Sequence, residues 1–312
     1  MPAPKLLMVL TENWTLVPPR DLRALIRLAV EAEQAGIDGV MLSEHIVLGP
    51  GAGAYGVMAN PRDYAAPGNQ DPAMPWPSST VLMAAIAQAT STLRIVAGAI
   101  IAPLRHPLHL AKELATLDLL SEGRLVVLPS VSWHRDEYDA LGVPFHRRGR
   151  IMDEQLEILR AAWTPGPISH HGAHFQFDDV WIEPQPWRPG GPPLWFGGQG
   201  VHPPLLRRLV RYGAGLNPFG PLTDTDLTAV RTAFTEAGRD PGDLELIGGI
   251  RATFGGEDDT GDIDAALADL PRQLDQGFTT ICFKPSMFID DPAMIGPFCR
   301  RLRRKVDALT PR

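Results

Sequence analysis

Short apolar runs alternate with amphipathic stretches along almost the whole chain. The run at residues 6–10 ends in polar residues, and after Asp21 apolar positions recur three and four apart. A short apolar run is typical of a buried strand, and the later spacing is typical of a helix. Gly36 closes this helix, and a second apolar run occupies 39–42. The chain therefore starts as strand, helix, strand.

The same alternation continues to the end of the chain. Strands alternating with helices form a parallel sheet covered on both faces, and eight such strands close most naturally into a barrel. We therefore predict one (β/α)8 TIM barrel domain over residues 1–312. A doubly wound open sheet is disfavoured because no GxGxxG motif follows the first strand. The further strands are predicted at 94–101, 125–131, 194–197, 213–216, 245–254 and 279–283, and the further helices at 79–89, 109–120, 148–163, 204–212, 224–237, 263–276 and 292–309.

Two stretches interrupt this rhythm, and we interpret them as insertions. Residues 46–78 are rich in Gly, Pro, Ala and Asn, and residues 164–192 contain a histidine-rich segment and a proline-dense one. Loops of this length are uncommon in a compact domain unless they cover a site or form inserts. The first follows the second strand, so we expect it over the carboxyl end of the barrel, where sites in this fold are built.

Composition narrows the class of protein. The chain has 312 residues, of which 44% are hydrophobic and 21% charged, as in globular proteins with a sizeable core. A formal net charge of -7 argues against a nucleic-acid binder, because phosphate binding needs clustered cations. Cys282 and Cys299 are too few for a disulfide framework, so we expect both to be reduced and buried. No segment looks like a signal peptide or a membrane span, so we expect a cytoplasmic protein.

Four stretches give the chain a family resemblance. It resembles the luciferase-like (bacterial luciferase-related) oxidoreductases, especially their deazaflavin-dependent branch, over nearly its whole length. The resemblance implies coenzyme F420 as cofactor, with FMN as the alternative, a small-molecule substrate and a homodimer. The matching stretches, in the family's order and spacing, are LSEH at 42–45, RHPLHLAKELATLDLLSEGRL at 105–125, SWHRDEYDALGVPFHRRG at 132–149 and PLWFGGQG at 193–200.

His45 is the first candidate catalytic residue. It directly follows the strand at 39–42, so its ring should point into the barrel mouth, and imidazole titrates near neutral pH. The resemblance places a histidine here beside the reactive ring, which makes His45 a general acid or base; a loop-anchoring histidine is the alternative. Its neighbour Glu44 stands where the family more often has aspartate. Glu44 is expected to orient His45, to contact the cofactor's polar edge, or to be an ordinary structural carboxylate.

The third strand is expected to pass beneath the cofactor ring. It resembles a family strand with a non-prolyl cis peptide, which by this match falls between Ala99 and Ile100. Such a bond costs about 3 kcal/mol, so it persists mainly at functional sites. Gly98 and Ala99 are small enough to permit close approach. A regular barrel strand is the alternative.

The segment after the fourth strand departs from the family pattern. Relatives usually carry alternating glycines before a tryptophan, whereas this chain has Leu128, Ser130 and Ser132 before Trp133. By the resemblance, Ser130, Val131, Ser132 and Trp133 contact the cofactor. Serine hydroxyls can bond ribityl oxygens, but larger side chains also narrow the site, and a purely structural role for the serines stays open.

A glycine-rich turn follows the fifth strand. Gly197, Gly198, Gln199 and Gly200 precede the helix predicted at 204–212. Exposed backbone N–H groups and a helix dipole together can hold a phosphate. The position resembles the family's phosphate loop; a simple tight turn is the alternative.

Aromatic residues near the predicted mouth suggest an apolar substrate pocket. Trp14 lies just beyond the first strand, and Tyr55 and Trp76 lie within or beside the first insertion. We predict that they contact a substrate or cofactor ring. Packing of the core or of the loop itself is the alternative.

Other polar clusters are interpreted without assigning chemistry to them. His170, His171 and His174 lack a nearby acidic or cysteine partner, so no metal site is predicted. Asp136 and Glu137 fit the first turn of a helix better than an acid/base dyad.

Three functions follow from these residues. The first is F420-dependent hydride transfer to or from a small, mainly apolar organic substrate, with His45 moving the accompanying proton. The second is an FMN-dependent monooxygenase that uses reduced flavin and O2. The third is a flavin-binding barrel without catalysis, which the residues at 128, 130 and 132 would explain.

Overall fold

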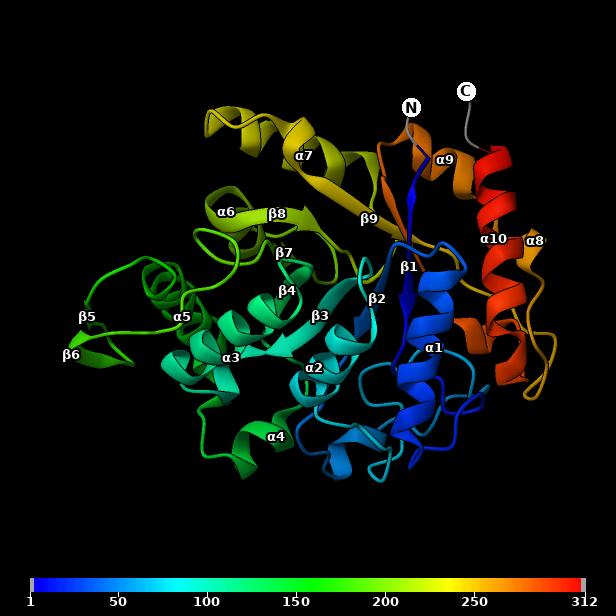
Figure 1. The fold of residues 1–312 in the computed structure, drawn as a ribbon, viewed down its shortest axis with the longest axis horizontal. Helices are drawn as coiled ribbons and strands as arrows, with labels where there is room; N and C mark the ends of the chain where they lie inside the picture. Colours follow the sequence, from blue (N-terminus) through cyan, green and yellow to red (C-terminus); the bar gives the residue numbers. More distant parts are fainter. Residues whose placement is uncertain (1–2, 310–312) are drawn as a thin grey trace.

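The computed structural model describes residues 3–309, in which eight strands close into a barrel (Figure 1). Neighbouring strands are parallel, and β1 pairs with both β2 and β10, which closes the ring. This confirms the predicted TIM barrel and excludes the open sheet. In order around the barrel, the strands are β1 (Lys5–Val9), β2 (Gly39–Leu42), β3 (Arg94–Ile101), β4 (Leu125–Ser130), β7 (Leu194–Phe196), β8 (Gly213–Leu216), β9 (Glu245–Gly249) and β10 (Thr280–Phe283).

Helices surround the barrel, and most lie where the apolar spacing predicts them. The helix predicted at 263–276 is in fact two helices, because Pro271 lies in the first turn of a new one. A short extra helix, α4, follows β4. The helices are α1 (Leu22–Gln34), α2 (Ser79–Ala89), α3 (Pro107–Leu120), α4 (Arg135–Ala140), α5 (Arg148–Ala162), α6 (Pro203–Tyr212), α7 (Asp224–Glu236), α8 (Ile263–Ala266), α9 (Leu270–Asp275) and α10 (Ile295–Leu309).

Two apolar layers hold the barrel together. The larger one packs the outer faces of the strands against the helices. The smaller one joins side chains from β1, β3, β4, β7, β9 and β10 that point away from the helices, which places it inside the barrel. Both cysteines are buried and unpaired, as predicted. The smaller cluster contains Leu7, Val96, Val126, Leu128, Trp195, Ile247 and Cys282.

An ion pair lies at the amino ends of the strands. The Arg94 guanidinium donates to both carboxylate oxygens of Glu245, at 2.8 and 3.0 Å, and lies over the ring of Trp195. The Thr280 hydroxyl also donates to Glu245. Burial alone would raise the pKa of Glu245, but the hydrogen bonds and charge of Arg94 bring it below its ordinary value. This end of the barrel is therefore fixed by charge as well as by apolar packing.

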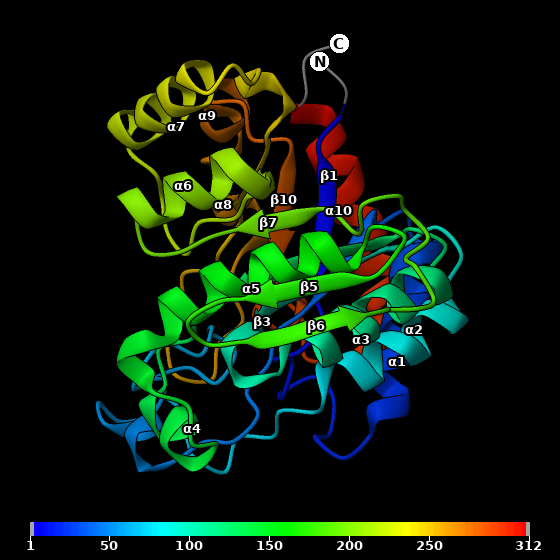
Figure 2. The same ribbon diagram turned by 90° about the vertical axis from the view of Figure 1, so that its left-hand side faces the viewer.

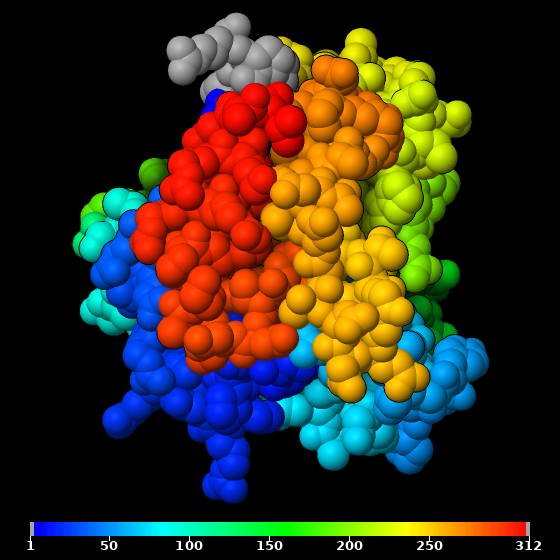
Figure 3. All heavy atoms as spheres, turned by 90° about the vertical axis from the view of Figure 1, so that its right-hand side faces the viewer, coloured from blue at the N-terminus to red at the C-terminus, as the bar shows by residue number. Residues whose placement is uncertain are grey.

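The first insertion covers the carboxyl ends of the strands, as its position in the sequence predicts. The Asn60 side chain donates to the carbonyls of Gly256 and Asp259, and Arg62 pairs with Asp290 at 2.7 Å. Figure 3 shows the light-blue to cyan insertion against the yellow-orange loop that follows β9. The loops that follow β9 and β10 thus hold the insertion over the barrel.

The second insertion contains an antiparallel hairpin outside the barrel, β5 (Ile168–His171) and β6 (Gln176–Val180) (Figure 2). Glu154 of α5 anchors its tip: the carboxylate accepts from the backbone N–H groups of His174 and Phe175 and contacts His170 Nε2 at 3.1 Å. Backbone pairing and this carboxylate hold the hairpin against the outside of the barrel.

Within residues 3–309, none of the helices is both long and apolar enough to cross a bilayer.

Candidate active site

A cavity of about 620 Å³ opens at the carboxyl end of the barrel. Its volume lies within the range of small-molecule sites, roughly 300–1,000 Å³. Side chains from the ends of several strands line it, as is usual for sites in this fold. Those predicted from the sequence are Glu44, His45, Trp76, Ala99, Ser130, Ser132, Trp133 and Gln199.

His45 is held in the cavity wall by a buried carboxylate. Its Nδ1 lies 3.1 Å from Oε1 of Glu137, whose side chain is fully buried in α4. Because a carboxylate only accepts, this contact places a proton on Nδ1 and leaves Nε2 free to exchange one. Glu137 also accepts from the Ile46 N–H at 2.8 Å and from the Ser132 hydroxyl at 3.3 Å. The imidazole is therefore fixed in both orientation and tautomer.

Three aromatic rings pack around His45. The ring centroids of Trp76 and Trp133 lie 5.1 and 5.7 Å away, both edge to face. His134 lies 6.0 Å away, and its Nε2 accepts from the Gly49 N–H at 2.8 Å. Burial lowers the pKa of His134, which favours the neutral ring that this hydrogen bond needs. His45 is thus the histidine placed to exchange protons with the cavity.

Both carboxylate oxygens of Glu44 accept hydrogen bonds from neighbouring residues of the fold. Its carboxylate accepts from the Ser79 hydroxyl at 2.6 Å and from the Ile101 N–H at 2.7 Å. Arg105 donates to both of its oxygens, at 2.7 and 2.9 Å. Of the roles expected for Glu44, these contacts favour the structural one: it ties the start of α2 to the end of β3. The residue that orients His45 is Glu137.

The prediction of a cis bond between Ala99 and Ile100 is wrong. Within residues 3–309 the cis bond lies between Glu183 and Pro184, and the Ala99–Ile100 bond is trans. The strand still bulges there, because Ala99 has a φ of 65° and the pairing with β4 shifts register between Ala97 and Ile100. A left-handed residue achieves the local bend that a cis bond was expected to produce.

The bulge places Ala99, alone among the three residues predicted on this strand, in the cavity wall. Ile100 is buried in the core. At Gly98 a Cβ would lie 2.3 Å from Cγ of Met41, so packing against β2 requires glycine there. The close approach that Gly98 permits is therefore between β3 and β2, and not between β3 and a cofactor ring.

The residues that replace the family's glycines differ in where they lie. Leu128 belongs to the barrel's inner apolar cluster and is 2% exposed. Ser130 and Ser132 do line the cavity, and the Ser132 N–H donates to the Ser130 hydroxyl. Ser132 adopts a φ of 52°, a conformation that glycine takes at lower cost. Only the two serines, and not Leu128, therefore narrow the site.

The glycine-rich turn packs closely against the loop after β8. At Gly197 a Cβ would lie 1.9 Å from the Asn217 carbonyl oxygen, and the Phe219 N–H donates to the Gly198 carbonyl at 3.1 Å. Gly200 has a φ of 71°, and Gln199 reaches the cavity. Side chains are thus excluded at Gly197 by packing, and backbone lies close to the cavity.

Of the three aromatic residues predicted in a substrate pocket, one lines the cavity and two do not. Trp76 lines the cavity, whereas Trp14 packs edge to face against Trp76 at 5.3 Å and donates to the Pro75 carbonyl. Tyr55 is 85% exposed and is not among the lining residues. The structure therefore supports a packing role for Trp14 and does not bring Tyr55 to the cavity.

The family follows from these features together with a match of residues 6–276 to the model for the luciferase-like monooxygenase domain. The chain belongs to the luciferase-like monooxygenase family.

Other comparisons find proteins that are similar to this chain. It is 39% identical over 121 residues to the uncharacterized protein Rv0953c of Mycobacterium tuberculosis, covering 38% of this chain and 41% of that one. It is 31% identical over 123 residues to the FMNH(2)-dependent dimethylsulfone monooxygenase of Pseudomonas putida, covering 38% and 34%. The chain thus spans about two fifths or less of these relatives' length. The coenzyme F420-dependent tetrahydromethanopterin reductase of Methanopyrus kandleri superposes with a TM-score of 0.68 at 14% identity, over 97% of this chain and 99% of that one, and so shares the fold.

This luciferase-like protein also has a buried lysine beside the barrel mouth, which sequence reasoning missed. Lys284 follows β10, is fully buried, and donates to the Asp63 carbonyl at 2.6 Å. Its ammonium lies 5.4 Å from the ring centroids of both Trp14 and Tyr64. Burial lowers its pKa to about 8, although the charge of Glu12 raises it. Lys284 therefore joins β10 to the first insertion.

Proposed function

We propose that this chain is a coenzyme F420-dependent oxidoreductase that transfers a hydride between the deazaflavin and a small, mainly apolar organic substrate. The observation that carries the proposal is the buried Glu137 behind His45. It supplies a fixed imidazole whose Nε2 can exchange a proton within the cavity. The fold and the family support a redox cofactor in the same cavity.

The residues present fit a planar cofactor with a phosphate. Ala99 narrows one wall of the cavity, and the serines at 130 and 132 offer hydroxyls on an adjacent wall. Gly198 and Gly200 lie in the turn before α6. Pro203 and Pro204 of α6 have no N–H and the Leu205 N–H already donates to His202 Nδ1, so the backbone N–H groups of the turn itself are the ones offered to an anion. We propose that these groups hold the ring, the ribityl chain and the phosphate respectively.

When bound, F420 would supply the donor or acceptor of the hydride. The protein supplies orientation, exclusion of water and proton transfer. When a substrate hydroxyl is oxidised to a carbonyl, Nε2 of His45 takes the hydroxyl proton; in the reverse direction it returns that proton to the carbonyl oxygen. Glu137 stabilises the charged imidazolium, and Trp76 and Trp133 limit the access of water.

The test separates binding from proton transfer. Purified protein is titrated with F420 and with FMN by fluorescence, and turnover is followed with a panel of secondary alcohols and enones. His45→Ala should keep cofactor affinity and lose about 10²-fold or more in kcat, the usual size of acid/base assistance. His146→Ala, at an exposed position, is the control and should change neither. Unchanged turnover in His45→Ala would show that the proposed role is wrong.

An FMN-dependent monooxygenase is the second candidate. It is favoured by the similarity to the FMNH(2)-dependent dimethylsulfone monooxygenase. Tight FMN binding without F420 binding would establish it in place of the first. A non-catalytic barrel loses one of its three supports, because Leu128 lies in the core; it predicts cofactor binding without turnover. The homodimer stays a prediction, which light scattering would test.

A further inference from the structure

The cavity does not end at the barrel mouth. It continues through the barrel wall between β8 and β9, since its lining includes both His45 and Gln276 of the outer layer. The pairing of β8 with β9 stops at Leu216, where the chain turns toward β7: the Asn217 N–H donates to the Phe196 carbonyl at 2.9 Å. β9 runs on beyond this point, so its last residues have no strand beside them on that side.

A side chain from α9 supports the unpaired end of β9. Gln273 accepts from the Gly249 N–H and donates to the Gly249 carbonyl, both at 3.0 Å. The adjacent Gly248 leaves room for this amide, because a Cβ there would lie 2.1 Å from its oxygen. The Gly249 backbone therefore keeps its hydrogen bonds although the wall has an opening, which we call the lateral passage. Its walls are Pro218, Phe219, Pro221, Leu222, Ile247, Gly248 and Phe278.

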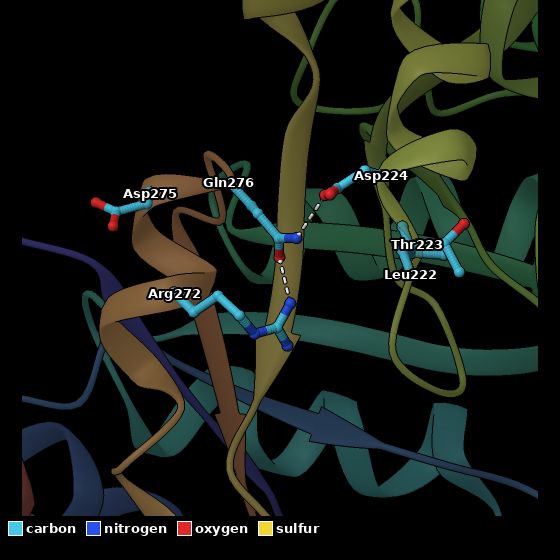
Figure 4. A pocket seen from close by; sticks show the side chains of 6 residues that line it. All are labelled: Leu222, Thr223, Asp224, Arg272, Asp275 and Gln276. Atoms are coloured by element: carbon cyan, nitrogen blue, oxygen red, sulfur yellow. Dashed lines mark hydrogen bonds between the residues drawn. The ribbon is translucent and has the colours of Figure 1, made fainter.

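The lateral passage reaches the surface in a groove between α7 and α9. This outer pocket has a volume of about 560 Å³ and shares Leu222, Arg272 and Gln276 with the main cavity. Figure 4 shows the Gln276 amide between Asp224 and Arg272, to which it is hydrogen bonded at 3.0 Å each. Exposed hydrogen bonds of this kind contribute little net stability, so the bridge can part to admit a ligand.

We propose that the lateral passage receives the remote part of the substrate, an unbranched apolar chain that ends in a neutral or cationic group. The proposal rests on the proposed function only in placing the reacting end of that substrate beside His45. The passage walls are apolar, and Leu222, Ile247 and Phe278 are nearly inaccessible to solvent. A chain within them removes its own apolar surface from water.

The charges at the outer end determine which end group fits. Asp224, Asp269 and Asp275 lie at the outer end with Arg272, and Arg231 lies beside it, donating to the Gln276 carbonyl at 3.0 Å. Arg272 is already engaged by both oxygens of Asp269. A carboxylate or phosphate in the pocket would therefore meet net negative charge, whereas an amine, amide or hydroxyl would find acceptors. The same charges disfavour this route for an anionic cofactor tail.

Binding of homologous probes to the full chain tests the proposal. Calorimetry with n-alkylamines from hexyl to dodecyl, below micelle-forming concentrations and without cofactor, should show affinity rising about fourfold for each added methylene, the equivalent of about 0.8 kcal/mol. Dodecanoate should bind at least tenfold more weakly than dodecylamine. Affinity that does not depend on chain length, or that is equal for the anion, would refute the proposal.

A blocking variant locates the site. Gln276→Trp should fill the outer end of the lateral passage and reduce the affinity of both dodecylamine and hexylamine at least tenfold, because the amine of each lies there. Val81→Trp places the same side chain at a 70% exposed apolar position of α2 and should change neither. Equal loss in both variants, or none in Gln276→Trp, would contradict the proposal. Because no cofactor or turnover is involved, these outcomes are independent of whether the hydride-transfer proposal holds.

Discussion

Glu137 is a buried carboxylate, and both of its oxygens take part in hydrogen bonds next to His45. Glu137→Gln keeps its size but removes the charge that stabilises a protonated His45. We expect kcat/KM to fall about tenfold or more and the acid side of its pH profile to move, with cofactor affinity retained. Asp139→Asn, on the same helix but exposed, is the control. A uniform loss at every pH would indicate a structural role alone.

Lys284 should leave a signature in the pH dependence of stability. A lysine ordinarily titrates near 10.5, and burial lowers this pKa to about 8, so between these values the unfolded chain holds more protons than the folded one. The free energy of unfolding should therefore rise with pH in that window, by up to about 1.4 kcal/mol per pH unit from this group. Lys284→Met should remove this slope.

Denaturant unfolding of both proteins from pH 7 to 10 measures the Lys284 effect. The buried thiols of Cys282 and Cys299 have pKa values raised to about 12 by burial and act in the opposite sense near pH 9. The slope is therefore taken as the difference between wild type and variant. Lys112→Met, at an exposed lysine, serves as control. Parallel curves for wild type and Lys284→Met would contradict the assignment.

Among elements, the β5–β6 hairpin depends on one side chain of α5. Burial would raise the pKa of Glu154, but hydrogen bonds from Phe175, His174 and His170 lower it below its ordinary value. Glu154→Ala should speed amide exchange at the hairpin tip by roughly tenfold, the equivalent of one charge-assisted hydrogen bond, and leave the barrel strands unchanged.

Hydrogen exchange read by mass spectrometry checks the hairpin prediction. Glu157→Ala removes the next carboxylate along the same helix, which pairs with Arg211 and not with the hairpin. If the amides of the hairpin tip exchange equally fast in both variants, Glu154 is not the anchor of the tip.

Strand positions could be predicted well because fully buried parallel strands are short apolar runs with clear ends. β9 is the exception: the sequence predicts it to 254, and it ends at Gly249. Ile250 still bonds to the Cys282 carbonyl, but Arg251 then pairs with Asp63 of the first insertion, so the chain leaves the barrel. Such a partner, almost two hundred residues away, leaves no local signal.

Contacts between residues far apart in the sequence also limit how well the site could be predicted. His45 and its strand-end position follow from periodicity, and the glycine turn follows from composition. The pairing of His45 with Glu137 spans 92 residues, and that of Lys284 with Asp63 spans 221. Glu137 also fits the first turn of α4, where carboxylates are common, so its second role had no separate sequence signal.

For the whole molecule, the Arg94–Glu245 pair should govern resistance to acid. Because the pKa of Glu245 is lowered in the folded state, its contribution is present above the ordinary glutamate value and is lost as pH falls through the folded one. Glu245→Gln should reduce the free energy of unfolding at pH 7 by about 3 kcal/mol and make acid unfolding less steep.

Urea unfolding at pH 7 and pH 4 tests the Glu245 prediction. Glu113→Gln, an exposed position on α3, provides the matched charge change. The stability difference between the Glu245 and Glu113 variants should shrink at the lower pH. A constant difference at both pH values would mean that the carboxylate's charge is not what matters.

Gln273 has a consequence for self-association. An unpaired sheet edge is a template on which a strand from a neighbouring molecule can add, and closed barrels normally avoid that hazard by having no edge. Here the primary amide of Gln273 saturates the Gly249 backbone in the manner of a single residue of a ninth strand. The barrel wall can thus stay open at the lateral passage without offering free backbone groups at Gly249 to a strand of another molecule. Loss of that amide would expose the protein to edge-to-edge aggregation.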